Sequence, residues 1–144
     1  MCYQNTLKKP PKDIAGYFAA EIEEGFAGEV FHANGFTFPD WPILDMNQPG
    51  LLRIRQWGLI PSWVKNVEEA KKMRAFNLNA RSETMFEKAS FRNGIHHGRC
   101  LVPSTGFIEW RELGKKKYPY FISLKDRELF SMAGLCEQWV RPDT

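Results

Sequence analysis

Cysteine is scarce in this sequence, which has only Cys2, Cys100 and Cys136 among its 144 residues. An odd number without a close pair argues against a disulfide framework and against a Cys-x-x-Cys metal site. Cys100 and Cys136 stand in apolar, strand-like runs, so we expect both to be small buried hydrophobic residues. We expect no metal and no other cofactor.

Long hydrophobic runs and a strong charge of one sign are also missing. No apolar run approaches the ~20 residues that cross a bilayer, so we expect no membrane partner. The first residues show no signal-peptide pattern, which makes a cytoplasmic protein the expectation. The net charge of +3 permits an anionic partner without requiring one.

The length and the residue patterns predict one domain with an α+β fold. Strand-like runs outnumber helical ones, so we expect a mostly antiparallel, barrel-like β-sheet with flanking helices. Apolar residues at helical spacing predict a helix over residues 13–24. A second helix is predicted over residues 66–76, with Asn66 and Glu69 at capping-box spacing, and a short one over residues 83–90.

Residues 99–110 form the most informative stretch. Two short apolar runs are joined by Pro-Ser-Thr-Gly, a pattern typical of strand, turn and strand. The second run contains Glu109 between Ile108 and Trp110, and strand alternation turns Glu109 to the opposite face. A carboxyl group that loses hydration beside apolar surface suits proton transfer near neutral pH. The alternative is a surface glutamate on a solvated face of the sheet.

Three further side chains are candidates for nucleic-acid contact. If the backbone is extended there, Asn79 and Arg81 share one side and offer an amide and a guanidinium group suited to phosphate. The alternative for this stretch is a capped transition from loop to helix. Trp63 ends an aromatic loop that either stacks on bases and wedges a duplex, or fills the core.

The start of the chain offers a different chemistry. A small second residue normally allows removal of Met1, which gives Cys2 a free α-amine beside its thiol. The alternative is an ordinary exposed or buried cysteine. His96 and His97 have no third ligand nearby in the sequence, so we expect them in a solvent-facing loop and not at a metal.

Six motifs then follow one another in the order of a known family. They are Met1-Cys2, Trp57-Gly58…Pro61-x-Trp63, Asn79-Ala-Arg-Ser-Glu-Thr84, Arg99-Cys-Leu-Val-Pro…Gly106-Phe-Ile-Glu-Trp110, Lys117-Tyr-Pro-Tyr-Phe-Ile122 and Ala133-Gly-Leu135. In this order the whole chain resembles the SRAP domain, the SOS response-associated peptidase family. The resemblance implies a β-barrel-like fold with flanking helices. It also implies covalent crosslinking to abasic sites in single-stranded DNA.

The resemblance assigns roles to six residues. It implies that the catalytic residues are Cys2 as nucleophile, Asn79 as sugar contact and Glu109 as active-site acid. It implies that the DNA contacts are Arg81 at a phosphate, Trp63 in the loop that separates strands at the lesion, and Asn34 at an active-site asparagine position.

The sequence departs from the family pattern at two places. The family usually begins Met-Cys-Gly-Arg, whereas Tyr3 and Gln4 follow Cys2 here. The chain reaches Thr144 before the family's His-x-Arg-Met-Pro segment, and none of the three histidines stands in that motif. We therefore expect a single SRAP-like domain over residues 1–144 that lacks the C-terminal histidine segment.

Three functions remain open at this point. The first is a monomeric enzyme, lyase-like or thiol-peptidase-like, that binds single-stranded DNA with abasic sites. It forms a thiazolidine crosslink through Cys2 after removal of Met1, and it is nucleoid-associated when bound to DNA. The second is a non-catalytic nucleic-acid-binding module or an inactive truncated fragment. The third is an N-terminal-nucleophile autopeptidase, in which the amine of Cys2 serves as base for its own thiol.

Overall fold

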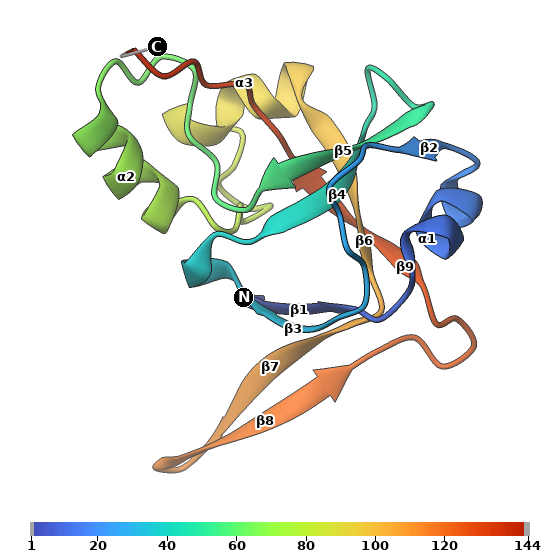
Figure 1. Ribbon diagram of the computed structural model, residues 1–144. Coiled ribbons are helices and arrows are strands. Elements are labelled where there is room, and N and C mark those ends of the chain that lie inside the picture. The colour runs from blue at the N-terminus through green and yellow to red at the C-terminus, as the bar shows by residue number, and fades with distance from the viewer. Residues whose placement is uncertain (1, 143–144) are drawn as a thin grey trace.

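Two β-sheets form the centre of the protein (Figure 1), whose computed structural model describes residues 2–142. The first sheet has the strand order β3 (Val30–Asn34), β1 (Gln4–Leu7), β7 (Gly106–Leu113) and β8 (Lys116–Ile122). The second has the order β2 (Glu21–Ile22), β5 (Leu51–Gln56), β4 (Asp40–Asp45), β6 (Arg99–Ser104) and β9 (Phe130–Leu135). Only the pairing of β2 with β5 is parallel among the described strands.

Helices lie around these sheets, and the predicted α+β class is confirmed. They are α1 (Pro11–Phe18), α2 (Val67–Phe76), α3 (Ala89–His97) and the short 3-10 helix η1 (Gly35–Thr37). The barrel-like sheet predicted from the sequence is present as two separate sheets, neither of which closes on itself. Within residues 2–142, no helix is long and apolar enough to cross a bilayer.

The hydrophobic core lies between the two sheets and is closed by α1. Its buried members come from both sheets, α1 and the loop before β9: Leu7, Ile14, Ala33, Trp41, Leu44, Leu52 and Leu129. The indole of Trp41 donates to the backbone oxygen of Pro103 at 3.0 Å. The central strand β4 is therefore fastened to β6 by a side chain as well as by the ladder.

The predicted strands within residues 99–110 are present, but they belong to different sheets. β6 ends at Ser104 and β7 begins at Gly106, so the chain crosses from the second sheet to the first through Thr105 alone. Glycine is favoured at this corner because position 106 has φ 155°, and a Cβ there would lie 3.0 Å from the backbone oxygen of Ile122 and 2.2 Å from Cζ of Phe121. The turn is thus a corner between sheets.

The helix predicted over residues 13–24 is too long. α1 ends at Phe18 because Ala19 adopts a left-handed conformation with φ 49°. Ile22 then pairs with Leu52 in the parallel β2–β5 ladder. Strand pairing therefore overrides the helical spacing of Ile22.

The short helix predicted over residues 83–90 is also wrong. Residues 82–87 form turns, and α3 begins at Ala89, where buried Phe91 and Ile95 share one face. His96 and His97 are consequently in the last turn of α3 and not in a loop. The helix over residues 66–76 is confirmed, with Asn66 accepting a hydrogen bond from the Glu69 amide at 2.8 Å.

The cysteines differ from expectation in one respect. Cys100 is buried, as predicted, but Cys136 is only half-buried. The two side chains are diagonal neighbours, with Cys100 on β6 and Cys136 just beyond the end of β9, although 35 residues separate them in sequence. The sequence gives no sign of this pair because the long β7–β8 excursion lies between its members.

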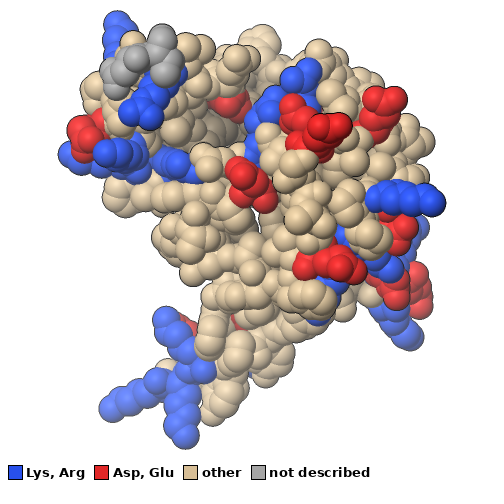
Figure 2. All heavy atoms as spheres, in the orientation of Figure 1, with Lys and Arg blue, Asp and Glu red and all other residues tan. Residues whose placement is uncertain are grey.

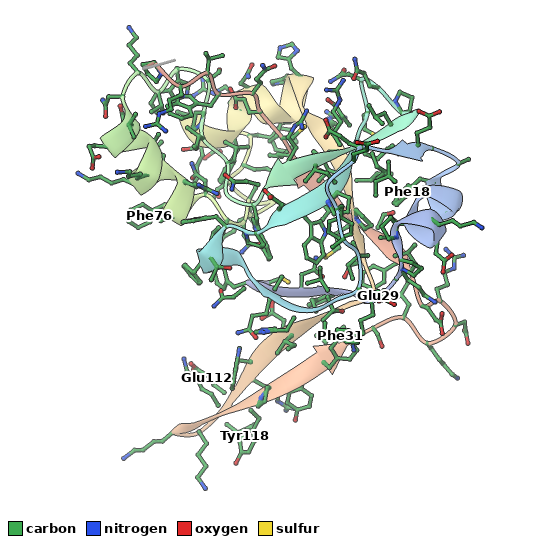
Figure 3. All side chains as sticks on the ribbon, viewed as in Figure 1. Phe18, Glu29, Phe31, Phe76, Glu112 and Tyr118 are labelled. Carbon is green, nitrogen blue, oxygen red and sulfur yellow. The ribbon has the colours of Figure 1, made fainter. Side chains whose placement is uncertain are left out.

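The β7–β8 hairpin projects from the body of the protein, as Figure 1 and the labelled Glu112 and Tyr118 in Figure 3 show. Its strands are linked by a turn through Gly114 and Lys115. Figure 2 shows Lys and Arg side chains gathered at its tip, where Lys115, Lys116 and Lys117 are exposed. The part of the hairpin nearest the body pairs with β1 and so contributes to the candidate site.

Substitution of Gly106 tests the corner between the sheets. Gly106→Ala is expected to lower the free energy of unfolding by about 1–3 kcal/mol, because alanine is strained at φ 155° and its methyl group crowds the backbone oxygen of Ile122 and the ring of Phe121. Gly50→Ala is the matched control, since a Cβ at Gly50 meets nothing within 4 Å, and it should change stability by less than about 0.5 kcal/mol. Urea denaturation of both variants measures the difference, and equal stabilities would contradict the close approach.

Candidate active site

A buried hydrogen-bond network holds the N-terminal strand against the corner between β6 and β7. The hydroxyl of Ser104 donates to Oδ1 of Asn5 at 2.6 Å, and the backbone N–H of Thr6 donates to the same oxygen at 2.9 Å. The hydroxyl of Thr6 donates to the backbone oxygen of Gly106 at 2.9 Å. Asn5 and Ser104 are 2% and 0% exposed, so these bonds form out of competition with water. The network fixes β1 relative to β7.

Cys2 lies two residues before β1 and is positioned by this anchored strand. Its thiol is half-buried and donates a weak hydrogen bond to the backbone oxygen of Gln4 at 3.4 Å. Burial raises the pKa of the Cys2 thiol above its ordinary value, the negative charge of Glu109 raises it further, and a backbone hydrogen bond with Gln4 partly offsets both. The thiol is therefore mainly protonated at neutral pH. The predicted removal of Met1 falls on a residue outside the described part of the chain.

Glu109 is on β7, the strand next to β1. The β1–β7 ladder pairs Asn5 with Phe107, and continuing this antiparallel register places Tyr3 opposite Glu109. Glu109 is half-buried, and its charge acts on the Cys2 thiol. The pairing of strands about 100 residues apart therefore brings the Glu109 carboxylate near enough for its charge to act on the Cys2 thiol.

Asn34 ends β3 on the other side of β1, where it pairs with Gln4. Its side-chain oxygen accepts a hydrogen bond from the Phe36 amide at 3.1 Å and caps η1. The Gly35 amide donates to the backbone oxygen of Tyr3 at 2.8 Å, next to Cys2. Asn34 thus lies near the N-terminus, but its carbonyl group is already used in the cap.

Trp57 connects the loop that carries Asn79 to the start of η1. A Cβ on Gly35 would lie 3.1 Å from the Trp57 ring, and the indole of Trp57 donates to the backbone oxygen of Leu78 at 2.8 Å. The loop that carries Asn79 is therefore fastened beside η1. Nδ2 of Asn79 is buried and has no hydrogen-bond partner among the described residues. An unpaired buried donor is costly, typically by about 1–3 kcal/mol, unless a ligand accepts from it.

Arg81 is two residues further along this loop and is exposed. Its backbone oxygen accepts hydrogen bonds from the amides of Thr84 and Met85, at 3.1 and 2.8 Å. The loop therefore turns sharply after Arg81. Asn79 and Arg81 are held by one ordered segment between α2 and α3, on the same loop but with different exposure.

Trp63 belongs to another part of the surface. It is 45% exposed and lines a groove of about 400 Å³ with α3 residues, including Arg92 and His96. Neither this groove nor a larger one of about 890 Å³ is lined by Cys2, Asn79 or Glu109. Trp63 does not fill the core, and the structure groups it with α3.

The positioning residues Asn5 and Ser104 are missing from the sequence-based prediction. Their only signal is the presence of polar residues inside strand-like runs, which is equally typical of a solvated strand face. Trp57 was assigned to a loop, and its bond to the Asn79 loop could not be foreseen from local pattern. Among the described residues, no group of three or more His, Cys, Asp and Glu side chains could hold a metal ion.

Comparison with known proteins identifies relatives along the entire chain. The Bacillus subtilis protein named abasic site processing protein YoqW is 37% identical over 150 residues, which cover 99% of this chain and 63% of that protein. The Gallus gallus protein named abasic site processing protein HMCES is 35% identical over 117 residues, covering 68% of this chain and 34% of its own length. The chain thus spans less than two thirds of the length of these relatives.

A solved structure agrees with these matches. The crystal structure of a protein from Bacteroides thetaiotaomicron superposes with a TM-score of 0.87 at 38% identity, over 99% of this chain and 62% of that one. A protein from Bordetella bronchiseptica, at 22% identity and a TM-score of 0.78, has the same fold. Because the family model described as SOS response associated peptidase (SRAP) matches residues 1–144, this chain belongs to the SRAP family.

Proposed function

We propose that this chain processes abasic sites in single-stranded DNA by forming a thiazolidine crosslink through Cys2. The proposal is supported by membership of the SRAP family and by relatives named abasic site processing proteins. The observation that carries it is the position of the Cys2 thiol, half-buried beside β1 and within the electrostatic influence of Glu109. A thiol held beside an anchored strand, with the charge of a carboxylate acting on it, suits covalent chemistry.

The proposed reaction uses both nucleophiles of an N-terminal cysteine. After removal of Met1, the α-amine of Cys2 condenses with the open-chain aldehyde of the abasic sugar, and water leaves as the imine forms. The sulfur then adds to the imine carbon, and the thiol proton ends on the nitrogen. Because the second step closes a five-membered ring within one molecule, orientation supplies much of its rate.

Glu109 is the proposed proton carrier in this sequence. Because burial raises the pKa of the Cys2 thiol, the sulfur needs a base when it attacks at neutral pH. The nearby Glu109 carboxylate accepts that proton and returns it to the ring nitrogen. The same group donates a proton when the hydroxyl of the first adduct leaves as water.

Asn79 and Arg81 are proposed to hold the sugar and the adjacent phosphate. The buried Nδ2 of Asn79 is a donor without an acceptor in the protein, and a sugar hydroxyl would satisfy it. The exposed guanidinium of Arg81 matches a phosphate in shape and charge. Trp63 and Asn34 are proposed as outer contacts of the strand, with Trp63 stacking on a base beside α3.

The cysteine at position 2 is the central test of the crosslink. Cys2→Ser is expected to abolish the heat-stable adduct with a single-stranded oligonucleotide that contains one abasic site, because serine lacks the sulfur that closes the ring. Denaturing gel electrophoresis measures the adduct, and mass spectrometry of the N-terminus reports whether Met1 has been removed. Cys136→Ser is the matched control and should keep the adduct. Equal adduct yields from Cys2→Ser and the wild type would exclude the proposal, and DNA binding without an adduct in the wild type would favour a binding module.

The electrostatic link between Glu109 and Cys2 predicts a pH dependence. Because burial and the charge of Glu109 raise the pKa of the Cys2 thiol, its alkylation by iodoacetamide should have a midpoint above the ordinary thiol value of about 8.5. Glu109→Gln removes the negative charge and should move this midpoint to lower pH. Glu112→Gln, which removes a charge from the far end of the same strand, should leave it unchanged. Peptide mapping at each pH measures Cys2 separately, and identical profiles for the two variants would contradict the link.

The phosphate role of Arg81 predicts a change in salt dependence. Each phosphate contact with single-stranded DNA contributes about −0.7 to the slope of log K against log salt concentration. Arg81→Ala is therefore expected to make the slope less negative by about 0.7 and to weaken binding. Arg127→Ala, in the loop between β8 and β9, is the charge-matched control. Fluorescence anisotropy at several salt concentrations distinguishes the two, and the same slope in both variants would count against a specific contact.

A further inference from the structure

The thiols of Cys100 and Cys136 meet on the edge of the second sheet. The β6–β9 register pairs Cys100 with Gly134, and the Cys136 amide donates to the backbone oxygen of Gly98 at 2.7 Å just beyond the ladder. Cys100 and Cys136 are therefore diagonal neighbours, and the two-residue period of a strand places both on the same face. Each thiol therefore lies close enough to influence the ionisation of the other.

Gly134 makes room for this contact. A Cβ at Gly134 would lie 3.0 Å from Sγ of Cys100 and 2.7 Å from Cγ2 of Val102. Because Gly134, directly opposite Cys100, has no side chain, the space beside it is filled by the sulfur of Cys100. Any larger residue at position 134 would force the Cys100 sulfur away from its present place.

The two thiols differ in access to solvent. Cys136 is half-buried and lines the groove of about 890 Å³, whereas Cys100 is 4% exposed and lies behind it. A small neutral oxidant that enters the groove therefore meets Cys136 first. Such an arrangement, an accessible thiol with a second thiol in contact, is typical of a redox-sensitive pair.

The electrostatics favour the same order of reaction. The neighbouring Cys100 thiol lowers the pKa of the Cys136 thiol, and the positive charge of Arg55 acts in the same direction. Burial and the negative charges of Asp45 and Glu137 oppose this shift. The neighbouring Cys136 thiol, together with burial, raises the pKa of the Cys100 thiol. Cys136 is consequently the more readily ionised thiol of the pair.

We propose that Cys136 and Cys100 form a peroxide-reactive dithiol, with Cys136 as the attacking thiol and Cys100 as the resolving one. The Cys136 thiolate attacks one oxygen of hydrogen peroxide, the O–O bond breaks, and a sulfenic acid and hydroxide form. The Cys100 sulfur then attacks the sulfenic sulfur and displaces hydroxide. The Cys100 proton and one from solvent convert the two hydroxides to water. In total, two thiols and one peroxide give one disulfide and two waters.

The disulfide would fasten β9, the last strand of the second sheet, to β6. β6 leads directly to Ser104 and the corner that positions β1 and β7. Oxidation therefore stiffens the frame of the candidate active site without touching Cys2. The inference is independent of the crosslinking chemistry, because neither Cys100 nor Cys136 takes part in it.

Peptide mapping after mild oxidation tests the proposal on the full chain. Arg99, Arg111 and Arg127 allow trypsin to place Cys100, Cys136 and Cys2 on three separate peptides. One equivalent of hydrogen peroxide, followed by alkylation of the remaining thiols, is expected to join the Cys100 and Cys136 peptides with the loss of two hydrogens. Dithiothreitol should release them. Cys2→Ala, treated in the same way, should give the same crosslinked pair.

The cysteine variants separate the two roles. Cys136→Ser should leave Cys100 reduced, because the buried thiol has no accessible partner to transfer the oxidation. Cys100→Ser should allow Cys136 to proceed to sulfinic acid, since no resolving thiol remains. If Cys100→Ser fails to fold, trapping with dimedone in the wild type replaces it, and the adduct should appear on Cys136. Oxidation of Cys2 alone, or of wild-type Cys136 to sulfinic acid without a crosslink, would overturn the proposal.

Discussion

The hydrogen bond from Ser104 to Asn5 is the contact on which the candidate site depends. Both groups are buried, so breaking the bond would leave a donor or an acceptor unsatisfied away from water. The same Asn5 oxygen accepts from the Thr6 amide, which makes it the centre of a small polar network inside an otherwise apolar core. The network connects the first strand of the chain with a corner about 100 residues later.

This constraint explains why an N-terminal residue can take part in a defined site. Chain termini are usually poorly ordered unless they are tied down. Here β1 is an inner strand between β3 and β7, and Cys2 stands two residues before it. Glu109 approaches from β7, and η1 approaches from β3. The thiol thus gains neighbours from both sides of its own strand.

The second sheet serves a different purpose, because it carries the elements that bring Asn79 into place. Trp57, just after β5, packs on Gly35 and donates to the oxygen of Leu78. The loop between α2 and α3 is therefore tied to the first sheet through one indole ring. Cys100 on β6 and Cys136 just after β9 lie at the edge of this sheet, and β6 ends at Ser104, whose hydroxyl group donates to Asn5 of the first sheet.

The sequence by itself determined the α+β class, the capped helix after Asn66 and membership of the SRAP family. These features depend on residues that are close together in the sequence and on the order of the motifs. The sequence also named Cys2, Asn79 and Glu109, but whether these residues meet depends on strand pairing between distant segments. Only the tertiary structure decided that β6 and β7 belong to different sheets and that α1 stops at Phe18. It alone brought Cys100 to Cys136, since the free energy of such contacts comes from packing and pairing that no local period records.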